Sequence, residues 1–179
     1  VFSHEPGQVS DNLPSSGSKN GFTFLDANVG FITGSEPVVE DLYLYRTADG
    51  GQNWEKKSCE NLPVFGEADM WMPSPVRRIN PNVAYVAIEA LIAERDTTVT
   101  HWCKTEDAGE SWQYVSSRDQ IEFSDFGSPT FGVAYGNGKM LRTIDGGLTW
   151  DDYTPNTCPG MVPVSVQVVS DVLAYMVCS

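Results

Sequence analysis

The sequence predicts an all-β fold in which about four small four-stranded antiparallel sheets form the blades of a β-propeller. Three observations predict this fold: a turn motif that occurs three times, short apolar runs of strand length before each copy, and two chain ends that together supply strands of one more blade. The chain has 179 residues, of which 41% are hydrophobic and 20% charged, which suits a single domain (1–179) with a folded core.

The repeated motif reads Thr-x-Asp-x-Gly-x-x-Trp and occupies residues 47–54, 105–112 and 143–150. A hydroxyl residue, an aspartate and a glycine so close together are typical of a tight turn, because the aspartate accepts hydrogen bonds from nearby backbone N–H groups and glycine permits positive φ. We expect the tryptophan to begin the next strand and to bury its ring. The motif predicts structural roles for Thr47, Asp49, Gly51, Trp54, Thr105, Asp107, Gly109, Trp112, Thr143, Asp145, Gly147 and Trp150.

A degenerate copy of the motif is found at residues 3–10, where Glu5 and Gly7 keep the acid and the glycine but the tryptophan is missing. The segment 1–13 thus begins at a turn between a third and a fourth strand, whereas 164–179 provides a first and a second strand. Paired in one composite blade, the two segments would close the ring and remove exposed sheet edges. A trimmed larger propeller, or two chains that share one ring, would give the same pattern, and these alternatives stay open.

Each predicted blade contains alternating or β-branched apolar runs that are bounded by turn residues, which is the pattern of strands. The predicted strands are 21–25, 29–33, 42–46 and one from Trp54 in the first blade (21–58); 76–79, 83–88, 98–104 and 112–115 in the second (76–116); 121–123, 131–135 and 140–142 in the third (121–154); and 164–169 and 172–178 in the composite blade (164–179 plus 1–13).

The charge balance disfavours two classes of partner. The chain carries 24 acidic and 11 basic residues, a formal net charge of −13, and a field of that sign repels nucleic acid and anionic membrane surfaces. The apolar stretch 164–178 is broken by polar residues, so we expect no membrane insertion. With only two histidines, His4 and His101, and no Cys-x-x-Cys pair, no metal site or cofactor is expected.

The four cysteines of this small acidic chain predict disulfides and therefore an oxidising compartment: an extracellular, periplasmic or cell-surface location. Three pairings are possible. Proximity in the sequence favours Cys59 with Cys103 and Cys158 with Cys178, and four buried free thiols are the alternative.

The candidate ligand-binding residues lie in and just after a long segment, 59–75, which the sequence predicts to be a loop. An aromatic residue flanked by two methionines offers an adaptable apolar contact surface, and binding residues are often carried on loops. In the alternative interpretation, the aromatic ring fills a gap between blades. The candidate residues are Trp71, Met70, Met72, Arg77 and Arg78.

The three turn motifs resemble the Asp-box, or BNR, repeat of sialidases, sortilin-type receptors, some xyloglucan hydrolases and photosystem II assembly factors. The segment 44–54 is close to the consensus of that family, and 24–31 resembles its passage from a first to a second strand. The resemblance implies a β-propeller whose repeats lie on peripheral turns away from the ligand face. It implies a structural role for Asp49, Asp107 and Asp145, with calcium ligation as the alternative.

The resemblance does not fix a function, because this fold carries unrelated activities. We expect a non-catalytic, exported binding or scaffold module that recognises a protein or a glycan through one loop face. The alternative is a glycoside hydrolase, sialidase-like or xyloglucan hydrolase-like, which needs two carboxylates about 5–9.5 Å apart. An assembly chaperone is a third possibility, although the acidity of the chain argues against the basic patch of that family. No catalytic residue is singled out, and the oligomeric state is left open.

Overall fold

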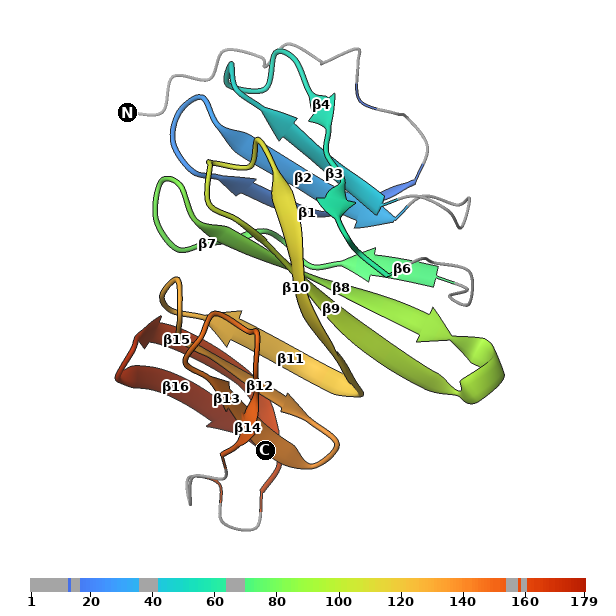
Figure 1. Ribbon diagram of the computed structural model, residues 1–179, viewed down its shortest axis with the longest axis vertical. Coiled ribbons are helices and arrows are strands. Elements are labelled where there is room, and N and C mark those ends of the chain that lie inside the picture. Colours follow the sequence, from blue (N-terminus) through green and yellow to red (C-terminus); the bar gives the residue numbers. More distant parts are fainter. Residues whose placement is uncertain (1–12, 14–16, 36–41, 64–69, 154–157, 159–160) are drawn as a thin grey trace.

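The structure is a computed structural model that describes residues 13, 17–35, 42–63, 70–153, 158 and 161–179. Within these residues the regular elements are strands, apart from one short 3₁₀ helix, η1 (Ala93–Arg95). The strands form four sheets that follow one another in chain order along an arc (Figure 1). This confirms the predicted all-β fold.

The first and third sheets each contain four antiparallel strands in sequence order. The first sheet is β1 (Ser18–Phe24), β2 (Gly30–Ser35), β3 (Leu42–Thr47) and β4 (Glu55–Lys56). The third sheet is β11 (Ile121–Phe126), β12 (Gly132–Gly136), β13 (Lys139–Thr143) and β14 (Asp151–Asp152). The fourth sheet has two strands, β15 (Pro163–Ser170) and β16 (Leu173–Cys178).

The second sheet is built around three long strands, β8 (Ala84–Ile92), β9 (Thr97–Thr105) and β10 (Trp112–Asp119). Two short strands, β6 (Met70–Pro73) and β7 (Arg77–Arg78), pair one after the other with β8 and together form one edge of this sheet. At the other edge, β5 (Cys59–Glu60) pairs in parallel with the start of β10.

The segment 70–73 differs from its sequence prediction, because it is a strand and not part of a loop. Buried Trp71 and Pro73 alternate with the more exposed Met70 and Met72, which is the period of a strand with one buried face. Proline is tolerated at this position because β6 is an edge strand, which does not need every backbone donor. Pro73 therefore ends a short edge strand.

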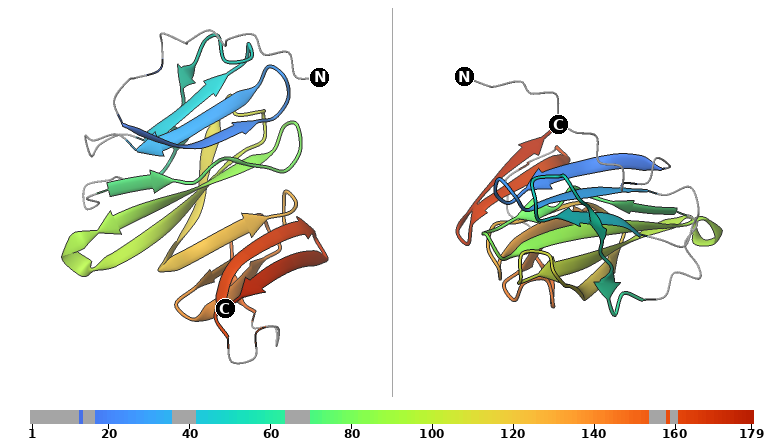
Figure 2. Two further views of the ribbon diagram at one scale, coloured as in Figure 1. Left: turned by 180° about the vertical axis from the view of Figure 1, so that it is seen from behind. Right: turned by 90° about the horizontal axis from the view of Figure 1, so that it is seen from above.

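Apolar side chains fill the spaces between neighbouring sheets. Phe31 and Leu44 of the first sheet pack with Val86, Ile88 and Trp112 of the second. Tyr85 and Trp102 of the second sheet pack with Phe126 and Trp150 next to or within the third, and Val168 of β15 packs on Val133 and Met140. Sheets stacked face to face in this way, each sharing a core with the next, have the arrangement of propeller blades (Figure 2).

Most of the predicted composite blade lies outside the described residues, because 1–12 and 14–16 are not among them. Leu13 packs against Tyr45 and Trp54 of the first sheet. The β15–β16 hairpin lies at the other end of the arc from β1–β4 (Figure 1). Pairing between 1–13 and this hairpin stays a prediction.

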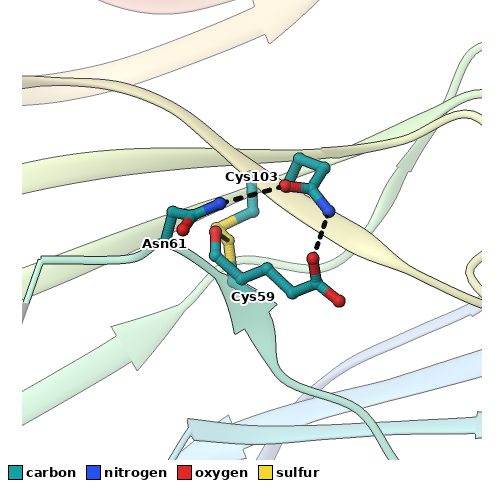
Figure 3. The surroundings of a disulfide bond; sticks show 5 residues. Cys59, Asn61 and Cys103 are labelled. Atoms are coloured by element: carbon teal, nitrogen blue, oxygen red, sulfur yellow. Dashed lines mark hydrogen bonds between the residues drawn. A yellow bond between two sulfur atoms is a disulfide. The ribbon is translucent and has the colours of Figure 1, made fainter.

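The cysteines form two disulfides, Cys59–Cys103 and Cys158–Cys178, which is the pairing favoured by sequence proximity. The first bond ties β5, which follows the first sheet, to β9 of the second sheet (Figure 3). Beside it, Asn61 Nδ2 donates to Gln113 Oε1 at 3.3 Å. Because β5 lies at the edge of the second sheet, this bond fastens the segment that follows the first blade onto the second blade.

No helix among the described residues has the length and apolar character needed to cross a membrane.

Candidate functional site: the cleft between the second and third blades

The first repeat turn uses its polar side chains to fold itself. Thr47 Oγ1 donates to Asp49 Oδ1 at 2.8 Å and accepts from the Gly51 N–H at 2.9 Å. Asp49 in turn accepts the Asn53 backbone N–H at 2.9 Å and the Asn53 side-chain amide at 2.7 Å. Gly51 has φ +92°, a conformation that glycine adopts without strain.

The other two turns repeat this network almost atom for atom. Thr105 and Thr143 each donate to the aspartate of their own turn at 2.8 Å. Each aspartate then accepts a backbone and a hydroxyl donor four residues later, at 2.9 and 2.6 Å, from Ser111 in the second turn and from Thr149 in the third. We refer to 47–54, 105–112 and 143–150 as the repeat turns.

The hydrogen bonds of the repeat turns hold their aspartates in the charged form. The backbone N–H and side-chain amide of Asn53 lower the pKa of Asp49 to about 2. Burial acts to raise the pKa of Asp107, but the hydrogen bonds from Ser111 and Thr105 outweigh it and lower the pKa. The hydroxyl and backbone N–H of Thr149 lower the pKa of Asp145. The carboxylates are thus engaged within the turns.

The repeat turns also connect neighbouring blades. Arg46, three residues before Asp49, donates through Nε to the Ala108 carbonyl at 2.9 Å and pairs with Glu110 at 2.9 Å in the second turn. A Cβ atom on Gly109 would overlap the ring of Phe31. The tryptophans that end the repeat turns, Trp54, Trp112 and Trp150, are all buried. These contacts give the turns a structural role.

The candidate ligand residues around Trp71 are only partly accessible. Trp71 is 7% exposed, and its ring lies 5.6 Å from that of His101. It belongs to the core shared by the first and second blades, as in the interpretation that it fills a gap between blades. Met70 is 47% exposed and Met72 is half-buried. Both lie on the face of β6 opposite Trp71. Trp71 therefore does not present its ring to a partner.

Arg77 and Arg78 have different surroundings. Arg77 Nε lies 2.7 Å from Asp125 Oδ1 of β11, and its Nη2 donates to the Val168 carbonyl of β15 at 2.9 Å. Burial raises the pKa of Asp125, against the opposite effects of the Val168 N–H and the Arg77 guanidinium. Arg78 is exposed. Arg77 thus joins three blades.

A cleft of about 310 Å³ opens between the second and third blades, at the end of the sheets opposite the repeat turns. The register places Met72 beside Glu89 and Glu89 beside Thr100, on one face of the second sheet. The start of β11 forms the facing wall. The lining residues are Met72, Pro73, Ser74, Ala87, Glu89, Thr100, Ile121, Glu122, Phe123 and Ser124.

One buried polar group of this cleft, the Thr100 hydroxyl, lacks a partner among the described residues. Thr100 is 2% exposed, and its Oγ1 has no hydrogen-bond partner in the described part of the chain. Burial raises the pKa of the Glu89 carboxyl above its ordinary value. A buried hydroxyl without a partner and a carboxyl desolvated by burial cost folding free energy, and such groups are more frequent at functional sites.

The sequence analysis did not select these residues. One signal was present: Glu89 is the single charged residue in the apolar run 84–92 and directly follows the predicted strand 83–88. Thr100 carries no such signal, because most threonines in strands are structural. Glu122 lines the same cleft as Glu89 only because two blades stack together, which local patterns do not report.

The described residues also line two other hollows. One, of about 390 Å³, lies beside the second and third repeat turns and includes Lys104 and Leu148. The other, of about 490 Å³, lies between β12–β13 and the β15–β16 hairpin. There the Arg142 guanidinium lies 5.0 Å from the Tyr153 ring centre. Across the described residues, no group of three or more histidine, cysteine or acidic side chains is placed to hold a metal ion.

Comparison with known proteins supports the fold. No model of a protein family matches the sequence, and no curated protein matches it. Among solved structures, YCF48 bound to a D1 peptide is similar, with a TM-score of 0.56 and 18% identity over 85% of this chain and 45% of that one. YCF48 from Cyanidioschyzon merolae has the same TM-score and identity, over 87% and 48%. This chain spans less than half the length of either structure, and the likeness shows that it has a β-propeller fold.

Proposed function

We propose that this chain is a non-catalytic binding module built from Asp-box repeats, and that it recognises a protein through the face opposite the repeat turns. The observation that carries the proposal is the contrast between the two ends of the blades. The threonine and aspartate side chains of the repeat turns bond to each other, whereas Thr100, which lines an open cleft with Glu89, has no hydrogen-bond partner for its hydroxyl among the described residues. One similar structure, YCF48 bound to a D1 peptide, holds a peptide.

The scaffold suits such a role because it holds the walls of the cleft in place. Trp102 Nε1 donates to Ser124 Oγ at 2.9 Å, which connects β9 to β11 just below the cleft. Arg77 and Asp125 join the same two blades nearer to β15. A preformed cleft loses little conformational freedom when a partner binds, so more of the contact energy becomes affinity.

The two disulfides support an exported location. Structural disulfides persist in oxidising compartments and are rare in the cytosol. We therefore place the working protein outside the cell, at its surface or in the periplasm, where its partner would also have to be accessible.

The proposal is tested by screening the folded protein against a peptide array and a glycan array in parallel. We expect selective binding of peptides, and we expect this binding to weaken in Glu89→Gln but not in Glu94→Gln, which removes an exposed charge at η1 of the same blade. Binding of glycans alone, or equal loss in the two variants, would contradict the proposal.

A glycoside hydrolase is the second candidate, because one observation favours it. Glu89 and Glu122 line the same cleft, and a raised pKa such as that of Glu89 is what a general acid needs. Aryl glycosides of several sugars test this possibility directly. Turnover that disappears in Glu89→Gln would support hydrolysis and reject the non-catalytic proposal.

A further inference from the structure

We infer that the cleft between the second and third blades receives a cationic side chain of the partner, an arginine or a lysine, on Glu89, Thr100 and Glu122. This inference rests on the proposed function, since it names the chemistry that the bound protein presents. The partner supplies the positive charge. The cleft supplies the carboxylates, the hydroxyl acceptor and the apolar walls.

The strand register brings the acceptors together. Glu89 of β8 and Thr100 of β9 are directly paired, and side chains paired in this way have Cβ atoms about 5 Å apart. Glu122 lines the cleft from β11 of the next blade. A cation in the cleft would thus be approached by oxygens from two blades.

The buried hydroxyl is the second, independent observation. Thr100 is 2% exposed, and its Oγ1 remains without a hydrogen-bond partner within the described residues. Leaving such a group unsatisfied costs folding free energy. An ammonium or guanidinium has several N–H donors and no acceptor, so it satisfies a hydroxyl oxygen and carboxylates at the same time.

The remaining walls fit the carbon chain of such a residue. Met72, Ile121 and Phe123 surround the cleft with apolar surface, and lysine and arginine bury their methylene groups against such surfaces while their charge reaches polar atoms. The volume of about 310 Å³ is of the size of a site for one side chain and leaves little room for a folded element.

The charge of the surroundings favours a cation from outside the chain. Arg118 of β10 is paired in register with Thr100, but its guanidinium donates to the Trp150 carbonyl at 3.3 Å and forms no ion pair with Glu89. The net charge of −13 attracts cationic partners from a distance. Among the described residues that line it, the cleft therefore has two carboxylates and no basic side chain.

The test is an NMR titration of the ¹⁵N-labelled protein with N-acetyl-arginine amide and, separately, with N-acetyl-citrulline amide, which has nearly the same shape without the charge. We expect the arginine probe to shift the resonances of Glu89, Thr100 and Glu122. Its affinity should exceed that of the citrulline probe at least about tenfold, because a charged hydrogen bond is lost with citrulline.

Three variants complete the experiment. Glu89→Gln should weaken arginine binding about tenfold, and Thr100→Val should weaken it about threefold while keeping the size of the side chain. Glu94→Gln changes the net charge equally and should leave binding unchanged. Thermal unfolding of each variant shows whether it is folded, and Glu122→Gln gives an independent test if Glu89→Gln is not.

Three results would overturn the inference: equal binding of arginine and citrulline, equal loss in Glu94→Gln and Glu89→Gln, or displacement of the arginine probe by stoichiometric calcium. The outcomes also separate this inference from the proposed function. Peptide binding that maps to the cleft by chemical shift but weakens equally in Glu89→Gln for arginine-free and arginine-containing peptides would reject the cationic receptor alone. Arginine binding without any protein or peptide ligand would reject the proposed function alone.

Discussion

Arg77 Nε lies 2.7 Å from Asp125 Oδ1, and this ion pair joins the second blade to the third. The same two side chains also reach the fourth sheet, because Arg77 Nη2 donates to the Val168 carbonyl at 2.9 Å and Asp125 Oδ2 accepts the Val168 N–H at 2.7 Å. Three blades are thus held by two charged residues. Arg77 was a candidate for ligand binding from the sequence, and the structure shows its guanidinium engaged in these contacts instead.

Replacement of Arg77 should therefore weaken the packing of the blades. Arg77→Ala removes the pair and leaves the mostly buried Asp125 carboxylate without its cation, so we expect a loss of about 1–3 kcal/mol; the value is moderate because Arg77 is 41% exposed. Arg78→Ala, at the exposed neighbouring position, should change stability by less than about 0.5 kcal/mol. Urea unfolding of both variants checks this, and equal losses would contradict the role of Arg77.

The repeat turns should depend on their threonines. Thr105 Oγ1 donates to Asp107 and accepts the Gly109 N–H at 2.8 Å. Thr105→Val keeps the shape of the side chain but leaves these groups unsatisfied, so we expect a loss of about 1–3 kcal/mol. Thr97→Val, at the other end of β9, has no such network and serves as the control. A Thr105→Val variant as stable as Thr97→Val in urea unfolding would refute the network's contribution.

Acid should weaken the repeat turns within a defined pH range. The folded pKa of Asp49 is about 2, against an ordinary value of 3.8, and the pKa values of Asp107 and Asp145 are also lowered. Because the folded pKa is lowered, the stabilisation is present above pH 3.8 and is lost as the pH falls toward 2.

The free energy of unfolding, measured by urea titration at several pH values, checks this expectation. Asp49→Asn removes the titrating group, so the variant should lose less stability than the original protein between pH 4 and pH 2. The same pH dependence in both proteins would contradict it. Because both carry nearly the same net charge, the comparison cancels the general effect of neutralising acidic residues.

The Cys59–Cys103 bond should stabilise the attachment of the edge strand β5 to the second sheet. It closes a segment with a sequence separation of 44, and the chain-entropy model gives about 4 kcal/mol for a loop of that length. We expect the Cys59→Ser, Cys103→Ser double variant to lose about 2–4 kcal/mol in urea unfolding. Mass spectrometry of unreduced peptides establishes the pairing. Cross-linked peptides that join Cys59 to Cys158 or Cys178 would contradict it.

Much of this fold follows from local sequence signals. The repeat turns could be predicted because their hydrogen bonds run between residues that are two to four positions apart, such as Thr47, Asp49 and Asn53. Strands such as β12 and β16 could be predicted because they are apolar runs between turn residues. The disulfide pairing followed from sequence proximity, and the structure has the same pairs.

The candidate site could not be predicted in the same way. The short strand β6 was concealed by Pro73 and Pro75, and its position decides that Trp71 faces the core. The pairing of Glu89 with Thr100 depends on the register of two long strands. Glu122 reaches the same cleft only through the stacking of two blades, so its role depends on residues far from it in the sequence.

The central claim is that the cleft binds and the repeat turns build the scaffold. Chemical-shift mapping of the ¹⁵N-labelled protein with a bound peptide from the array tests it most directly. We predict shifts at 72–74, 87–89, 100 and 121–124, with the repeat turns unchanged. Shifts concentrated at 47–54, 105–112 or 143–150, with the cleft residues unaffected, would contradict the claim.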